Sequence, residues 1–314
     1  MMKIITAIYA YRFHIVISYL NHGIAIVPFR DKRDKFHGSV KFKDEFEFPA
    51  ELIELNAKRN TLFGTSNNSL YSVDLTTNYN SKIEKTISSE LFDKKISQLS
   101  IDYDLNNLFA YSSNEGIFQL NINNPNEPKL VKTIVPKEFE KIGDPIITNM
   151  VTSNSNILIS IRNYGTAHLS NQNNDFKDKK TLRSTDPQDV NFISGPNIIT
   201  IADREEGVLL FHENSTKPFE KIKLPNNDFP QQIGKIHQNI VIKGKYGLYL
   251  YNIYHSHLSV IREGKIGTFA TFYEYLFFSS SGKIYVQNLN NHFDNNFIDF
   301  NEKNPIEIIR SSFK

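Results

Sequence analysis

The chain has 314 residues, and its 36 Lys and Arg against 34 Asp and Glu give a formal net charge of +2. Proteins that bind the phosphate backbone of nucleic acids usually carry a strongly basic surface, so this balance argues against that class. The absence of cysteine excludes disulfides, thiolate metal clusters and cysteine nucleophiles. Hydrophobic residues make up 39% of the chain, with 24 Phe and 15 Tyr, which is enough apolar material for a packed core.

The N-terminal segment superficially resembles a secretory signal, because Lys3 is followed by a short apolar stretch that reaches Tyr11. Arg12 and His14 interrupt this stretch, and no small-residue cleavage pattern follows it. No apolar run approaches the roughly 18 residues that a membrane-spanning helix requires. We therefore expect no cleaved signal and no membrane insertion. The cytoplasm is the default compartment, with the cell envelope or the exterior as the alternative.

Seven similar hairpins follow one another along the chain. Each consists of a short apolar segment, a turn that contains Asn, Ser or Gly, and a second alternating segment. Six of the seven have a glycine at the turn or just after it, where a positive φ is inexpensive. Equivalent positions are 36 to 49 residues apart, so the pattern predicts a repeated β-hairpin. The copies begin near residues 14, 61, 107, 156, 197, 239 and 275.

Two further strands are expected to flank most of these hairpins. The preceding segments are 52–55, 98–101, 146–150, 189–193, 231–236 and 267–272, and a proline introduces several of them, at Pro49, Pro145, Pro187 and Pro230. The following segments alternate apolar and charged residues, as edge strands do, and are 38–42, 82–87, 129–134, 219–224 and 258–261. Residues 4–11 and 305–310 both resemble the preceding type. The sequence therefore leaves open which end of the chain completes the first set of strands.

Four antiparallel strands per repeat, seven repeats and a period in the low forties predict an all-β fold, a seven-bladed β-propeller with four-stranded antiparallel blades. A helical solenoid would need long segments with a period of 3.6 residues, and the sequence has none. One propeller accounts for the whole length without a linker, so we expect a single domain over residues 1–314.

The third copy resembles the LVIVD repeat family. It reads NLFAYSSNEGIFQLNINNPNEPKLV from Asn107: an apolar pair, a turn leading to Gly116, an alternating strand, then Pro125 and Pro128 three residues apart, and a final apolar pair. The second, fourth, fifth and sixth copies resemble the family more loosely. The resemblance implies a propeller fold, often in bacterial proteins at or outside the cell envelope, and it implies no particular chemistry.

Motifs of catalysis are absent from the sequence. There is no Gly-rich dinucleotide fingerprint, phosphate loop, Gly-x-Ser-x-Gly elbow or His-Glu-x-x-His motif. Residues 102–106 have the spacing of a calcium loop but lack its glycine and its final glutamate, which favours a polar turn. His255 and His257 share a face if their segment is a strand, and we interpret them as an exposed pair. We therefore predict no catalytic residues, no metal and no cofactor.

The predicted innermost strands carry few carboxylates. Asp189 and Glu54 are the exceptions, whereas Gln98, Asn149, Asn191 and Gln232 are amides. A propeller hydrolase would place carboxylates and histidines on these strands around its central channel. The amides therefore weaken the prediction of an enzyme.

Side chains at the tips of successive hairpins favour binding of another protein. Tyr and Arg are frequent hot spots of protein interfaces, and loops that a rigid scaffold presents often carry function. The predicted partner-binding residues, from the fourth to the sixth repeat, are Tyr164, Arg204, Glu205, Lys243, Lys245 and Tyr246.

The leading hypothesis is thus a non-catalytic interaction or scaffold module. One alternative is a carbohydrate-binding propeller with an aromatic residue repeated in every blade. It ranks lower because Tyr19, Tyr111, Tyr164 and Tyr246 lie near hairpins without a common register. The other alternative is a hydrolase or lactonase with a metal in the central channel.

Overall fold

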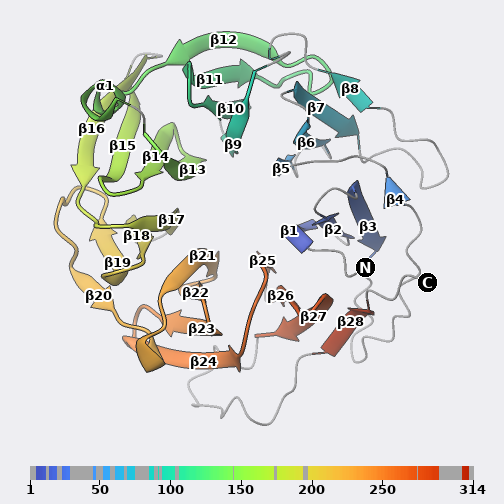
Figure 1. The fold of residues 1–314 in the computed structure, drawn as a ribbon, viewed down its shortest axis with the longest axis vertical. Coiled ribbons are helices and arrows are strands. Elements are labelled where there is room, and N and C mark those ends of the chain that lie inside the picture. The colour runs from blue at the N-terminus through green and yellow to red at the C-terminus, as the bar shows by residue number, and fades with distance from the viewer. Residues whose placement is uncertain are drawn as a thin grey trace. The chain divides into compact units, whose positions relative to one another are not determined.

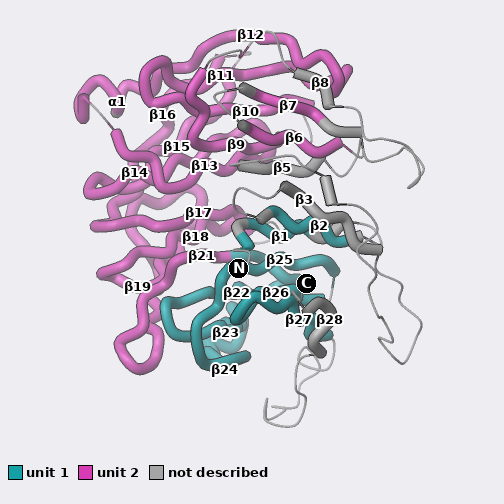
Figure 2. The backbone as a smooth tube through the Cα atoms, turned by 45° about the vertical axis from the view of Figure 1, so that its right-hand side comes forward, with its two compact units in different colours: residues 1–50, 234–314 teal, residues 51–233 magenta. Residues whose placement is uncertain are grey.

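A computed structural model of the chain describes residues 5–11, 14–19, 23–28, 45–46, 52–56, 61–66, 69–74, 85–87, 91, 94–102, 106–143, 145–172, 175–193, 197–273, 275–289 and 306–310. The chain divides into two compact units (Figure 2). The central unit comprises residues 51–233, and the terminal unit comprises residues 1–50 and 234–314. The expectation of one domain over the whole chain stays a prediction.

The central unit contains four antiparallel sheets, each built from four strands that are consecutive in the chain. The first has β5 (Leu52–Asn56), β6 (Thr61–Ser66), β7 (Ser69–Asp74) and β8 (Lys85–Ile87). The second has β9 (Ile96–Asp102), β10 (Asn107–Ser112), β11 (Gly116–Asn121) and β12 (Lys129–Ile134). The third has β13 (Ile147–Ser153), β14 (Asn156–Ile161), β15 (Gly165–Gln172) and β16 (Asp175–Leu182). The fourth has β17 (Pro187–Ile193), β18 (Ile198–Asp203), β19 (Gly207–His212) and β20 (Glu220–Ile222).

Three sheets of the same pattern contain the strands of the terminal unit, except that β21 starts four residues before its boundary. One has β1 (Ile5–Tyr11), β2 (His14–Tyr19), β3 (Gly23–Pro28) and β4 (Glu45–Phe46). Another has β21 (Pro230–Ile236), β22 (Asn239–Gly244), β23 (Gly247–Asn252) and β24 (His257–Glu263). The last has β25 (Phe269–Phe272), β26 (Tyr275–Ser280), β27 (Lys283–Asn288) and β28 (Ile306–Arg310).

These seven sheets confirm the all-β prediction and each of the seven predicted hairpins. The predicted following segment 38–42 lies outside the described residues, and the fourth strand of that sheet is β4. Strand β16 was not among the predicted segments, because its sequence DFKDKKTL has too few apolar residues to show an alternating pattern. The chain ends are also placed: β1 is the first strand of the first sheet, whereas β28 pairs with β27 as the fourth strand of the last. The resemblance of residues 305–310 to a preceding strand was therefore misleading, and the N-terminal segment completes the first set of strands.

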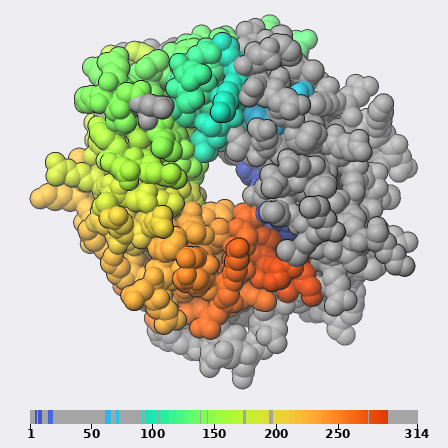
Figure 3. Space-filling model, viewed as in Figure 1, coloured from blue at the N-terminus to red at the C-terminus, as the bar shows by residue number. Residues whose placement is uncertain are grey.

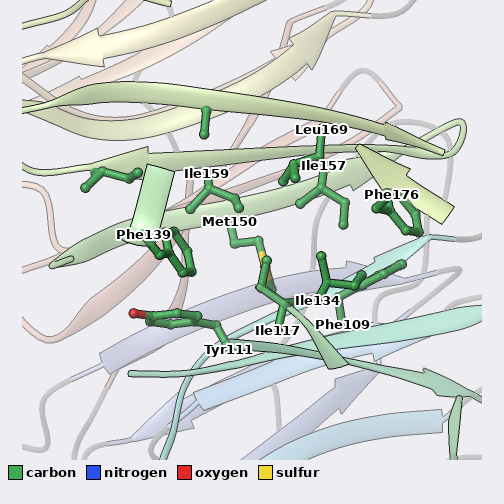
Figure 4. Close-up of a cluster of buried hydrophobic side chains, with 12 residues drawn as sticks. Phe109, Tyr111, Ile117, Ile134, Phe139, Met150, Ile157, Ile159, Leu169 and Phe176 are labelled. Carbon is green, nitrogen blue, oxygen red and sulfur yellow. The ribbon is translucent and has the colours of Figure 1, made fainter. Parts of the chain in front are cut away.

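Aliphatic and aromatic side chains fill the space between successive sheets. In the central unit, Tyr111 and Phe109 of the second sheet pack against Ile157 and Ile159 of the third (Figure 4). Figure 1 shows the first strands β9, β13 and β17 gathered on one side of this unit, with the fourth strands β12, β16 and β20 on the other. In the space-filling view these three sheets form a continuous surface (Figure 3). Both faces of a sheet that lies between two others in this unit are therefore buried.

The first and last sheets of the chain pack together within the terminal unit. Ile8, Ile15 and Ile17 of the first sheet share one buried cluster with Phe277 and Ile284 of the last. This contact joins the two ends of the sequence because the fully buried aliphatic faces need a partner that their own sheets do not supply.

One short helix interrupts the strand pattern. Helix α1 (Lys137–Ile142) connects β12 to β13, and its Phe139 packs edge-on against Tyr111 with a centroid distance of 5.7 Å. No described helix has the length and apolar character needed to cross a membrane.

Glycines at the turn between the second and third strands allow this turn to pack closely against the fourth strand. Gly165 has φ +128°, and a Cβ atom at this position would lie 2.5 Å from the carbonyl oxygen of Leu182. Gly207 has φ +96°, and its Cβ would collide with the carbonyl oxygen of Ile222. Any other residue would need both a disfavoured φ and a displaced outer strand, which explains why the repeat places glycine here.

Candidate functional site

In three sheets of the central unit, the first strand contains a β-bulge. The register of each shifts by one residue, at Ser97 in β9, Thr148 in β13 and Gln188 in β17. A bulge redirects the side chains beside it. The residues that follow the bulges are therefore equivalent to one another: Gln98, Asn149 and Asp189.

These equivalent polar residues connect each sheet to the next. Gln98 Nε2 donates to the carbonyl oxygen of Thr148 at 3.2 Å, which links the second sheet to the third. Thr148 Oγ1 donates to the carbonyl oxygen of Pro187 at 2.8 Å, and Asn149 Nδ2 donates to Asp189 Oδ1, which links the third sheet to the fourth. Two of the amides that weakened the prediction of an enzyme, Gln98 and Asn149, thus have a structural role that sequence alone did not reveal.

The carboxylate of Asp189 contacts groups from three sheets. Its Oδ1 accepts hydrogen bonds from Asn149 Nδ2 and from the Val190 backbone N–H, the latter at 2.8 Å. Its Oδ2 accepts a bond of 2.7 Å from the backbone N–H of Ile233 in β21. The residue is 7% exposed, and a buried carboxylate is tolerated where its oxygens are hydrogen-bonded in this way.

A second buried carboxylate organises the hairpin turn between β18 and β19. Asp203 is fully buried, and its Oδ1 accepts bonds from the backbone N–H groups of Glu205 and Glu206 at 2.9 and 2.8 Å. Its Oδ2 accepts a bond of 2.9 Å from the N–H of Asp186, which belongs to the connection from the preceding sheet. The turn is therefore fixed both internally and to its neighbour.

Two of the predicted partner-binding residues, Arg204 and Glu205, lie at this turn and are exposed. The Arg204 guanidinium lies over the ring of Phe229, 5.0 Å from its centroid. The carbonyl oxygen of Glu205 accepts a bond of 2.8 Å from Lys223 Nζ. The turn thus exposes the Arg204 guanidinium and, at the next position of the chain, the Glu205 carboxylate, while the contacts with Phe229 and Lys223 hold it in place.

Glu206 adds an ion pair at the base of the same turn. It accepts a hydrogen bond from Lys221 Nζ and one of 3.1 Å from Thr185 Oγ1. The bond from Lys221 is the main reason why the pKa of Glu206 lies below its ordinary value. The sequence analysis did not select Glu206. Nothing in the sequence around it, where Glu205 is equally acidic, indicates which of the two pairs with Lys221.

Tyr164 is less accessible than the hairpin pattern predicts. It precedes Gly165 at the turn between β14 and β15, and its backbone N–H donates to the carbonyl oxygen of Ile161 at 3.2 Å. Its half-buried side chain packs against the cluster between the second and third sheets. It therefore supports the turn as well as forming part of its surface.

The other three predicted residues lie in the terminal unit. Lys243 is half-buried in β22, whereas Lys245 and Tyr246 are exposed at the turn between β22 and β23. Lys245 Nζ lies 4.8 Å from the centroid of the Tyr246 ring, and the Tyr246 carbonyl accepts a bond of 2.7 Å from the Gly264 N–H. The six predicted residues are thus divided equally between the two units.

The histidine pair is exposed, as the sequence analysis predicts, but only His257 lies in a strand. His255 lies in the preceding turn, where its N–H donates to Asn252 Oδ1 at 3.0 Å. Among the described residues, no group of three or more His, Asp or Glu is arranged to hold a metal ion. Of the predicted polar turn 102–106, residues 103–105 are outside the described part. Asp102 is buried and accepts a bond of 2.9 Å from the Ser155 N–H.

The sequence analysis missed the role of His168, which is fully buried in β15. Its Nε2 lies 2.9 Å from Asn156 Oδ1, and its Nδ1 has no hydrogen-bond partner. Burial, and secondarily the positive charges of Lys179 and Lys180, lower the pKa of His168 from 6.5 to about 4. The imidazole is therefore neutral at pH 7 and packs as part of the buried core.

Comparisons with known proteins support the fold only. No family model matches the chain, and no curated protein matches it. A crystal structure of the computationally designed Ika8 protein is similar to it, with a TM-score of 0.66 and 10% identity, covering 92% of this chain and 85% of that one. In all, 1363 chains of solved structures match. A fold that is so widely used does not identify a function, which must be argued from the site.

Proposed function

We propose that this chain is a seven-bladed β-propeller of the LVIVD-repeat type that acts as a non-catalytic binding module for another protein. The seven sheets, each of four consecutive strands, support the architecture. Polar side chains of the first strands support a structural rather than a catalytic role for these strands, since Gln98, Asn149 and Asp189 bond to neighbouring sheets.

The observation that carries the proposal is the preorganised turn between β18 and β19. Three backbone N–H groups bond to the buried carboxylate of Asp203, while the side chains of Arg204 and Glu205 remain exposed. A surface that is already ordered loses little conformational entropy when it binds. Arginine is also among the residues enriched at interface hot spots.

A quantitative interaction screen with the full chain tests this proposal. The bait proteins are the wild type, Arg204→Glu, Lys245→Glu and the double variant, with Lys177→Glu as a matched control on the exposed edge of β16. We expect a protein partner that the wild type and the control retain and that Arg204→Glu or the double variant loses. A partner set that is unchanged in all charge-reversal variants would reject the hairpin turns as the binding surface.

A further inference from the structure

Within the terminal unit, strands β22, β23 and β24 pack against the sheet that contains β26 and β27. Leu248 and Leu250 of β23 share a buried cluster with Leu276 and Phe278 of β26. These residues show which face of each sheet is turned toward the other. Residues in register on paired strands lie on the same face, as do residues two apart on one strand. The two facing surfaces can therefore be followed along the register beyond the apolar cluster.

Three cationic side chains lie on these facing surfaces. Leu248 is in register with Lys243 of β22 on one side and with Arg262 of β24 on the other. In the opposing sheet Tyr285 packs against the same cluster, and Lys283 lies two residues before it on β27, a separation of about 7 Å. Lys243, Arg262 and Lys283 are all half-buried. We call these three residues the cation cluster.

The Arg262 guanidinium crosses from one sheet to the other and lies on two stacked aromatic rings. Its Cζ is 4.5 Å from the ring centroid of Tyr285 and 5.7 Å from that of Phe278, and the two centroids are 5.4 Å apart. No hydrogen bond or ion pair joins this guanidinium to any of the described residues. Stacking thus restricts the orientation of the planar group while its N–H donors stay available to a ligand.

Positive charge is concentrated at this end of the two sheets. The described turns and the connection that surround the cation cluster are the segments 243–248, 262–268 and 279–284. They contain five Lys or Arg residues and one carboxylate, Glu263, whereas the whole chain has a net charge of only +2. The five cations are Lys243, Lys245, Arg262, Lys265 and Lys283.

Strand β28 leaves this excess of positive charge unchanged. Its register sets Arg310 opposite Lys283 and Glu307 opposite Tyr285, so it adds one residue of each sign. Like charges that are partly removed from water repel one another more strongly than charges in bulk solvent. An anion held among the three residues of the cation cluster would therefore be stabilising.

We propose that the cation cluster binds a phosphate group, carried either by inorganic phosphate or by a small phosphomonoester. The guanidinium fork of arginine donates two parallel hydrogen bonds to phosphate oxygens, and lysine adds a compact positive charge. A phosphate monoester carries about −1.5 to −2 charges at pH 7, which suits several cations better than the single charge of a carboxylate. This binding goes beyond the proposed protein interaction, which is carried by the turn between β18 and β19, so either proposal can fail without the other.

Equilibrium dialysis of the full chain against radiolabelled inorganic phosphate, at neutral pH and constant ionic strength, tests this proposal. The variants are Arg262→Gln, Arg262→Lys and Lys283→Gln, and the matched control Arg183→Gln removes an exposed arginine of the central unit. Unlabelled phosphate, a sugar phosphate and acetate serve as competitors. Melting temperatures separate loss of binding from loss of structure. Lys283→Gln retains Arg262 and both aromatic rings, so it remains informative if Arg262→Gln lowers the stability.

We expect saturable phosphate binding that is at least about tenfold weaker in Arg262→Gln and Lys283→Gln and unchanged in Arg183→Gln. Arg262→Lys should also bind more weakly, because lysine keeps the charge but lacks the two parallel donors. Displacement at a lower concentration of sugar phosphate than of unlabelled phosphate would identify a phosphomonoester as the ligand, and the reverse order would identify inorganic phosphate. Absence of saturable binding, equal competition by acetate, or full affinity in both Arg262→Gln and Lys283→Gln overturns the proposal.

Discussion

Asp189 Oδ2 accepts a hydrogen bond of 2.7 Å from the backbone N–H of Ile233, a residue 44 positions away in the next sheet. The other oxygen of the same carboxylate accepts from Asn149 of the preceding sheet. One side chain thus connects two sheets of the central unit and the start of β21, whose Ile233 belongs to the same unit, and the cost of burying its charge is offset by charge-assisted hydrogen bonds. Position 189 therefore requires a side chain with two oxygen atoms that accept hydrogen bonds on opposite sides.

Asp189→Asn should destabilise the protein by about 2–4 kcal/mol, because an amide has one acceptor oxygen and cannot serve both sides. Its NH2 group would face either the Ile233 N–H or the Asn149 amide. Chemical denaturation gives the change in the free energy of unfolding. Asn191→Ala, on the same strand and half-buried, is the control and should change stability by less than about 1 kcal/mol. A small effect of Asp189→Asn would show that the carboxylate does not fasten the sheets.

Gly207→Ala should cost more stability than Gly264→Ala. Both glycines have a positive φ, +96° and +101°, so both alanines share the backbone penalty of about 1 kcal/mol. Only at Gly207 would the added Cβ collide with the Ile222 carbonyl, whereas the surroundings of Gly264 are open within 4 Å. Thermal and urea denaturation of the two variants measure the difference, which we expect to be at least about 1 kcal/mol. Equal losses would mean that β20 moves freely away from the turn.

His168 makes the protein less stable in acid. Its pKa is about 4 in the folded state and 6.5 in the unfolded state, so the unfolded chain binds more protons between these values. Stability therefore falls as the pH drops from about 6.5 to 4, by up to about 3 kcal/mol, and this contribution is then constant. His168→Gln removes this titration while keeping a donor for Asn156, so its stability should depend less on pH across that window. Denaturation midpoints at pH 7, 5.5 and 4 compare the two slopes, and identical slopes would contradict the assignment.

Asp203→Ala should loosen the turn between β18 and β19 without unfolding the sheet. The N–H groups of Asp186, Glu205 and Glu206 lose their shared acceptor, so their amide hydrogens should exchange at least about tenfold faster. Hydrogen exchange read by mass spectrometry or NMR measures this, with the Ile201 amide of β18 as the internal reference. The same variant should weaken binding of any partner that Arg204→Glu loses. Unchanged exchange at Glu205 and Glu206 would show that the turn is ordered without the carboxylate.

The repeat pattern in the sequence determined the strands, because each hairpin is a local structure whose alternation and turn glycine lie within about 15 residues. It likewise determined which side chains, such as Arg204 and Tyr246, stand at exposed turns. Period-two alternation is the same for a first strand and a fourth strand, however. The sequence could therefore not place residues 306–310, and pairing with β27 made them the last strand of the last sheet.

Only the tertiary structure decided the roles of side chains that act between sheets. Gln98, Asn149 and Asp189 look like polar residues of an open channel until their partners, 50, 40 and 44 positions away, are known. His168 looks like one more scattered histidine until burial is seen to hold it neutral. Local propensity fixes strands and turns, whereas burial and pairing across distant segments determine which groups are structural and which remain exposed for binding.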